Sequence, residues 1–273
     1  KKEYHTMRKS LVVMIAILTL TSVIGQVAAE GEYESGSYVA GQSEAAYAYT
    51  HGGYVGRAIA TVLSDGSLAV DLDEAFLPHT LAIVDMESSD WNATNTAFYV
   101  QRGNEVRVAK YVEYDGKLWV GTTVGTSLTY VEADETSLLP VGGTDLEKAI
   151  LRNQGTMAAY YKNIENGGFK IYKRLGEAAT PVTTTGYGGV TKKDSPGYWA
   201  FGVGWKGNME AIEAFIEEYG SAYPNSEMVR AAEENADGLK LWSVADAVSG
   251  ATNSDFKDYF NVAQAAISRL KKK

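Results

Sequence analysis

The residues best suited to chemistry lie together near the carboxyl end of the chain. An acid, Asp246, stands three residues ahead of Ser249, and Ser249 begins a Ser-Gly-Ala-Thr run that ends at Thr252. Thr252 and Asp255 have the Thr-x-x-Asp spacing of a capping box, ahead of an amphipathic run that ends at Leu270. We therefore expect Thr252 at or next to a helix N-terminus, where unpaired backbone N–H groups and the helix dipole favour a phosphate.

This run resembles the attachment motif of a bacterial flavoprotein family. Its FMN-binding domains, found in sodium-pumping quinone reductase and Rnf complexes and in extracellular electron-transfer flavoproteins, carry Asp-x-x-Ser/Thr-Gly-Ala-Thr. In that family a separate flavin transferase esterifies the last threonine to the phosphate of FMN. The matching residues here are Asp246, Ser249, Gly250, Ala251 and Thr252. The resemblance implies covalent FMN on Thr252, with Asp246 assisting phosphate transfer or ordering the loop, and Ser249 and Gly250 shaping it.

A purely structural interpretation of the motif stays open, because Ser-Gly-Ala-Thr before a helix can be a turn followed by a cap. Other chemistry is not indicated. Ser249 has no histidine or lysine partner in its sequence context, so we predict no catalytic residues of the hydrolase kind. His51 and His79 lack a second ligand at metal spacing, so we predict no metal site.

Glycines and aromatic residues alternate in a second stretch, residues 181–207. Glycines let a backbone approach a ligand closely, and flat aromatic side chains offer faces on which a flavin ring can stack. We expect Tyr187, Gly188 and Trp205 to form one wall of the FMN pocket, and Trp242 to cover the ring from the segment before the motif. The alternative is a glycine-rich hairpin whose aromatic side chains fill the core.

The amino-terminal stretch has the pattern of a secretory signal peptide. Basic residues at Arg8 and Lys9 precede an apolar run from Leu11 to Ile24, and small residues lead up to Ala29. The apolar run is shorter than the roughly 20 residues that a membrane span requires. We therefore predict cleavage after Ala29 and an exported chain that is periplasmic, extracellular or located in the cell envelope. The alternative is that the segment is not cleaved and serves as an anchor.

The composition restricts the function further. The chain contains no cysteine, so thiol catalysis, disulfides and iron–sulfur clusters are excluded, and redox chemistry requires a bound cofactor. Removal of residues 1–29 leaves 21 basic and 33 acidic side chains, a formal net charge of −12. Such a charge argues against nucleic acid and against anionic membrane surfaces as partners.

Hydrophobic patterning predicts an α+β fold, an antiparallel sheet meander with packed helices and an FMN-binding-domain-like C-terminal part. Two Asp-Gly dipeptides, at Asp65 and Asp115, predict hairpins between β-prone runs. We divide the chain into upstream residues and signal peptide (1–29), a β-rich region (30–160) and an FMN-binding-like region (161–273). Helices are predicted over 145–160, 208–219, 226–236 and 255–270, and strands over 54–63, 68–72, 105–114, 117–121 and 127–131.

Together these features predict an exported electron carrier rather than an enzyme with its own substrate, because no pocket with a paired acid and base is evident. The expected partners are a flavin transferase for maturation, and redox donor and acceptor proteins or a quinone-linked membrane complex. The alternative function is a non-redox, exported binding or envelope-associated module that carries no flavin.

Overall fold

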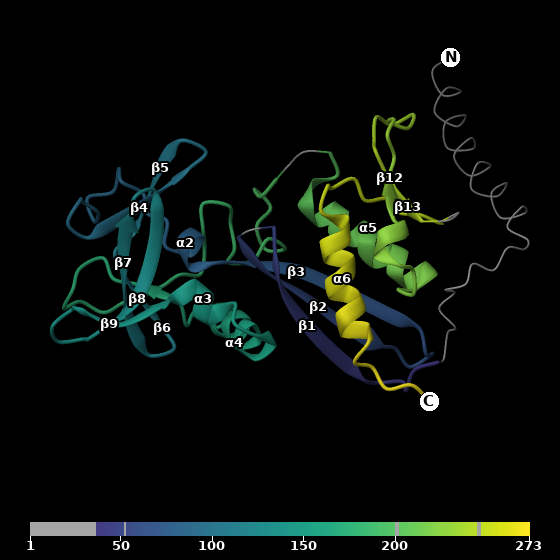
Figure 1. Ribbon diagram of the computed structural model, residues 1–273, viewed down its shortest axis with the longest axis horizontal. Coiled ribbons are helices and arrows are strands. Elements are labelled where there is room, and N and C mark those ends of the chain that lie inside the picture. Colours follow the sequence, from purple (N-terminus) through teal and green to yellow (C-terminus); the bar gives the residue numbers. More distant parts are fainter. Residues whose placement is uncertain (1–36, 52, 200–201, 245–246) are drawn as a thin grey trace, which may run out of the picture. The chain divides into compact units, whose positions relative to one another are not determined.

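The computed structural model describes residues 37–51, 53–199, 202–244 and 247–273 (Figure 1). The predicted signal peptide and Asp246 lie outside these residues. All of the described elements belong to one compact unit, Tyr33–Lys273. Within the described ranges, none of the helices combines the length and the apolar character needed to cross a membrane.

The first sheet is antiparallel and follows chain order: β1 (Ser43–Thr50), β2 (Tyr54–Val62) and β3 (Leu68–Phe76). The predicted turn between β2 and β3 is confirmed. Gly66 takes a φ of +87°, which suits glycine, and Asp65 Oδ1 accepts from the backbone N–H of Ser67 at 2.9 Å. Strand β3 continues past the predicted end at residue 72, up to Phe76.

Two long helices, α5 (Gly204–Tyr219) and α6 (Phe256–Ile267), pack against this sheet (Figure 1). Helix α6 contacts β1 and β2, and α5 contacts β3. Their predicted apolar stripes are buried, and the rings of Phe215 and Phe256 meet edge to face at 6.1 Å. The N-terminal strands and the C-terminal helices therefore share a core, across the predicted division at residue 160.

A second sheet has the strand order β11-β10-β6-β7-β8-β9, and β4 and β5 form a separate hairpin. The predicted strand 105–114 is two strands, because β5 pairs with β4 whereas β6 pairs with β7. The bounds are β4 (Thr96–Gln101), β5 (Asn104–Ala109), β6 (Tyr111–Tyr114), β7 (Lys117–Val124), β8 (Ser127–Ala133), β9 (Pro140–Asp145), β10 (Lys170–Ile171) and β11 (Thr180–Pro181).

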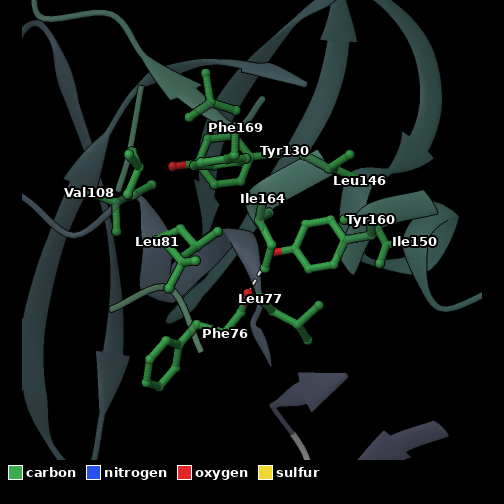
Figure 2. Packing of buried hydrophobic residues seen from close by; sticks show 14 of the residues in the cluster. Phe76, Leu77, Leu81, Val108, Tyr130, Leu146, Ile150, Tyr160, Ile164 and Phe169 are labelled. Atoms are coloured by element: carbon green, nitrogen blue, oxygen red, sulfur yellow. Dashed lines mark hydrogen bonds between the residues drawn. The ribbon is translucent and has the colours of Figure 1, made fainter. Parts of the chain in front are cut away.

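A hydrophobic cluster lies among these strands, the short helix α2 (Pro78–Leu81), α3 (Leu146–Ile150) and α4 (Gln154–Glu165) (Figure 2). Two of its buried tyrosines donate hydroxyl hydrogen bonds to backbone carbonyls. The hydroxyl of Tyr130 donates to the carbonyl of Ala109 at 2.6 Å, and that of Tyr160 donates to the carbonyl of Phe76 (Figure 2). The end of β3, at Phe76, is thus hydrogen-bonded to this hydrophobic cluster and is part of it.

Two helix predictions are wrong in detail. The predicted helix 145–160 is two helices, because the Asn153 side chain caps α4 by accepting from the N–H of Thr156 at 3.0 Å. The predicted helix 226–236 is instead a 3₁₀ turn, η1 (Asn225–Glu227), followed by β12 (Val229–Arg230). Strand β12 joins β13 (Trp242–Val244) and β14 (Ala247–Val248) in a small antiparallel sheet. The α+β class with antiparallel sheets and packed helices is confirmed.

Candidate functional site

The Ser-Gly-Ala-Thr run forms a loop that is closed by its own hydrogen bonds. The backbone N–H of Ser249 donates to the carbonyl of Trp242 at 2.7 Å, and Ser249 Oγ accepts from the N–H of Ala251 at 3.1 Å. The N–H of Trp242 in turn donates to the carbonyl of Ala251 at 3.3 Å. Ser249 and Ala251 are buried, so the loop is a packed part of the fold.

The loop lies directly against α5. A Cβ added to Gly250 would lie 3.3 Å from the Cβ of Ala211, so a larger residue would press the loop away from the helix. The requirement for glycine at this position is therefore the close approach of the loop to α5.

Asn208, in the second turn of α5, holds the end of the loop. Its Oδ1 accepts from the backbone N–H of Thr252 at 2.6 Å and from that of Asn253 at 2.9 Å. The hydroxyl of Thr252 lies 3.2 Å from the same oxygen, and Asn208 Nδ2 donates to the carbonyl of Gly204 at 2.7 Å. Asn208 is 1% exposed, so a single buried amide fixes both the backbone and the hydroxyl direction of Thr252.

The prediction that Thr252 caps the following helix is wrong. Helix α6 begins after Asp255, and no side chain caps it. The N–H groups of Thr252 and Asn253 are already bonded to Asn208, so they are not free to receive an anion. The capping-box spacing was satisfied in sequence, but the tertiary contact with α5 took precedence.

Two cationic side chains stand beside this loop. Arg230 of β12 donates from Nη2 to the carbonyl of Thr252, and Lys257 Nζ lies 5.6 Å from the centre of the Trp242 ring. Neither forms an ion pair with an acid in the described residues. Thr252 itself is half-buried, between the buried Ala251 and Asn253. Among the described residues, two cations without an ion-pair partner therefore lie near Thr252.

The tryptophans predicted for the pocket are both buried. The Trp242 ring stacks on Phe256, with centroids 5.3 Å apart, and its Nε1 donates to the carbonyl of Asn253 at 2.7 Å. Trp205 Nε1 donates to the hydroxyl of Tyr259 at 3.0 Å, and the Trp205 side chain is only 2% exposed. Trp242 thus packs next to the loop, whereas Trp205, in the first turn of α5, belongs to the core.

Tyr187 and Gly188 lie in a tight turn in which Thr185 and Gly188 exchange backbone hydrogen bonds of 2.9 and 3.0 Å. Gly188 has a φ of +129°, a conformation that favours glycine. The Tyr187 ring stacks on Phe76 at 5.6 Å and is 40% exposed. The glycine-rich stretch is therefore a hairpin-like turn that leaves one aromatic face open.

That face borders a hollow of about 470 Å³, lined by Tyr54, Gln101, Arg102, Tyr187, Tyr198 and Trp199. The volume lies within the range of about 300–1,000 Å³ that is usual for small-molecule pockets. The hydroxyls of Tyr54 and Tyr198 are hydrogen-bonded to each other at 2.9 Å. Of the predicted site residues, only Tyr187 lines this hollow.

A buried charge network lies next to the hollow, against the rings of Tyr54 and Tyr198. Lys192 Nζ forms an ion pair with Glu74 of β3, and both side chains are almost completely buried. Lys192 Nζ also lies 3.5 Å from the centre of the Tyr54 ring and 5.9 Å from that of Trp205. Burial lowers the pKa of Lys192, and the charge of Glu74 opposes this shift.

The network continues to the surface through His51. Its Nε2 lies 3.4 Å from Glu74 Oε1, and its Nδ1 lies 3.5 Å from Asp255 Oδ2. The Tyr259 hydroxyl donates to Glu74 Oε2 at 2.8 Å, and burial raises the pKa of this tyrosine. None of the residues of this network was predicted as a site residue. The sequence feature that could have indicated it is Glu74, an acid within the apolar end of β3.

The structure thus brings together five predicted residues, Ser249, Gly250, Ala251, Thr252 and Trp242, and adds Asn208 and Arg230 to them. Tyr187 lines the aromatic hollow instead, and Gly188 is its neighbour in the tight turn. Comparison with protein-family models, curated proteins and solved structures found no significant match.

Proposed function

We propose that this protein is an exported flavoprotein that carries FMN as a phosphoester on Thr252 and acts as an electron-transfer carrier in the cell envelope. The observation that carries the proposal is the setting of the Thr252 hydroxyl. Thr252 is the half-buried end of a hydrogen-bonded loop with the Asp-x-x-Ser-Gly-Ala-Thr pattern, and Asn208 Oδ1 lies 3.2 Å from its hydroxyl.

The surroundings of Thr252 suit a bound phosphate. Arg230 and Lys257 offer positive charge that no acid neutralises in the described residues. An arginine donates well to phosphate oxygens, and Arg230 already reaches the carbonyl of Thr252. Asn208 would orient the hydroxyl, Ser249 and Gly250 would keep the loop against α5, and Trp242 would support it from below. Bound FMN supplies one- and two-electron transfer.

The FMN-binding-domain-like character of the C-terminal part belongs to the same proposal, as do the partners. A flavin transferase would attach FMN, and donor and acceptor proteins, or a quinone-linked membrane complex, would exchange electrons with it. The lack of cysteine in the whole chain supports a bound organic cofactor as the source of any redox chemistry. Covalent attachment suits an exported protein, because free flavin would diffuse away outside the cell.

The test is co-expression with a flavin transferase, followed by denaturation and intact-mass measurement. We expect a yellow protein whose mass is raised by FMN less one water. Thr252→Val, which keeps the shape but removes the hydroxyl, should abolish attachment, and Thr252→Ser should retain it. Ser254→Ala, two residues along on an exposed position, is the matched control and should not change the mass.

Three results would contradict the proposal. A colourless wild-type product would favour the non-redox binding module, flavin retained in Thr252→Val would move attachment elsewhere, and flavin lost in Ser254→Ala would point to Ser254.

A further inference from the structure

We propose that the aromatic hollow binds a planar aromatic ligand that carries an anionic group. The faces of Tyr187, Tyr198 and Trp199 would stack on the ring system, and the guanidinium of Arg102 would meet the anion. This inference stands on the geometry of the hollow and does not require attachment of FMN.

The lining of the hollow indicates a flat ligand. Four of its six lining residues are aromatic, and Tyr187 and Trp199 are 40% and 38% exposed. The Tyr198 ring lies edge-on to that of Tyr187, with centroids 5.3 Å apart, and Phe76 stacks on Tyr187, so the partly exposed Tyr187 ring is held in place. Fixed and exposed aromatic faces are suited to stacking.

The charge at the rim indicates an anion. Arg102 forms no ion pair with an acid in the described ranges, although the chain carries a formal net charge of −9. Lys192, below the ring of Tyr54, is neutralised by Glu74, so Arg102 is the uncompensated cation of the lining. A guanidinium presents paired donors that match a carboxylate, sulfonate or phosphate edge.

Backbone strain at the same rim supports a binding role. Arg102 and Gly103 occupy the centre of the two-residue turn between β4 and β5, with φ of +50° and +82°. Such a turn prefers Asn, Asp or Gly at the position of Arg102. Trp199 also takes a positive φ, of +42°, which a bulky side chain rarely adopts. Arg102 and Trp199 thus both have positive φ values that their residue types rarely adopt, and such strained backbone is typical of functional sites.

Because the backbone at Arg102 is left-handed, a residue that favours this conformation can remove the charge without harming the fold. Arg102→Asn removes the charge but places a residue that the turn prefers, so the hairpin should be kept or stabilised. Arg152→Asn removes the same charge from an exposed position outside the hollow and is the matched control. Trp199→Asn likewise tolerates a positive φ while removing the stacking face.

The experiment measures binding of naphthalene-2-sulfonate and of neutral 2-naphthol by calorimetry to the colourless protein, produced without a flavin transferase. We expect Arg102→Asn to weaken sulfonate binding by about tenfold or more and to leave naphthol binding unchanged. Arg152→Asn should bind both probes as wild type does, and Trp199→Asn should lose both. Equal sulfonate binding by wild type and Arg102→Asn, or displacement of the probe by methyl glucoside, would overturn the proposal.

A second arm identifies the source of the ligand. If flavinylated protein excludes the sulfonate while Thr252→Val still binds it, the ring of the tethered flavin is the planar group that occupies the hollow. If both bind it equally, the ligand is a free molecule. A colourless wild type under flavin-transferase co-expression would refute the proposed function alone, because the first arm uses protein without flavin.

Discussion

Asn208 of α5 accepts hydrogen bonds from the backbone N–H groups of Thr252 and Asn253, at 2.6 and 2.9 Å, with a single side-chain oxygen. One buried amide therefore attaches the candidate loop to the helix that covers β3. The position of the Thr252 hydroxyl therefore depends on how α5 packs against the sheet.

Asn208→Ala should destabilise the protein and loosen the loop. The substitution leaves the N–H groups of Thr252 and Asn253 without a partner, at a cost of about 2 kcal/mol or more. Urea unfolding should show the loss, and the extent of flavin attachment should fall in the same variant. Ser254→Ala, at an exposed position, should stay within about 0.5 kcal/mol of wild type. Unchanged stability of Asn208→Ala would show that the loop is held by other contacts.

Lys192→Met should be among the most destabilising single substitutions. It leaves the carboxylate of Glu74 buried without its cation, which costs about 3–5 kcal/mol. The double variant Lys192→Met with Glu74→Gln should recover a large part of this loss, because the buried charge is removed as well. A double-mutant cycle by chemical unfolding measures the coupling, and additive losses would rule out a direct pair.

Asp73 provides a prediction of pH dependence. Burial raises its pKa above the ordinary 3.8, and the hydrogen bond from the N–H of Lys193 opposes this only in part. The stability that Asp73 contributes is thus fully present below pH 3.8 and is lost as the pH rises through the raised pKa. Asp73→Asn should therefore gain stability relative to wild type as the pH rises, as urea unfolding at several pH values would show.

Asp65 is the control of opposite sign. The side chain and the backbone N–H of Ser67 donate to it and lower its pKa below 3.8, so its contribution is present above that pH and is lost as the pH falls. Wild type should therefore gain stability relative to Asp65→Asn as the pH rises. The same trend in both variants would contradict the assignment of the two environments.

Phe256→Ala should destabilise the C-terminal core by about 3–5 kcal/mol, because this ring is buried between Trp242 and Phe215. The Trp242 ring loses its stacking partner, so the tryptophan emission should shift to longer wavelength in the folded variant. Phe256→Leu keeps most of the volume and should cost markedly less. Equal losses for both variants would indicate that ring stacking, and not volume, dominates the site.

The local pattern of the sequence was sufficient for the elements that local physics controls. The turn at Asp65-Gly66, the apolar stripes of α5 and α6 and the end of α5 at Gly220 follow from turn chemistry and periodicity. These features depend on residues within a few positions of each other, so they can be predicted from the sequence. The attachment motif at Thr252 is a local signal of the same kind, and its chemical role remains a proposal.

Tertiary structure alone decided which distant residues meet. The sequence gives no indication that Asn208 holds Thr252, that Glu74 pairs with Lys192, or that Arg102 shares a hollow with Tyr187, because these pairs lie far apart along the chain. The tertiary structure also explains why Thr252 does not cap α6. Its buried backbone N–H is bonded to the acceptor that the packing supplies, the side chain of Asn208. Local sequence determined the segments and the candidate hydroxyl, whereas the burial of α5 and α6 on the sheet determined the surroundings of that hydroxyl.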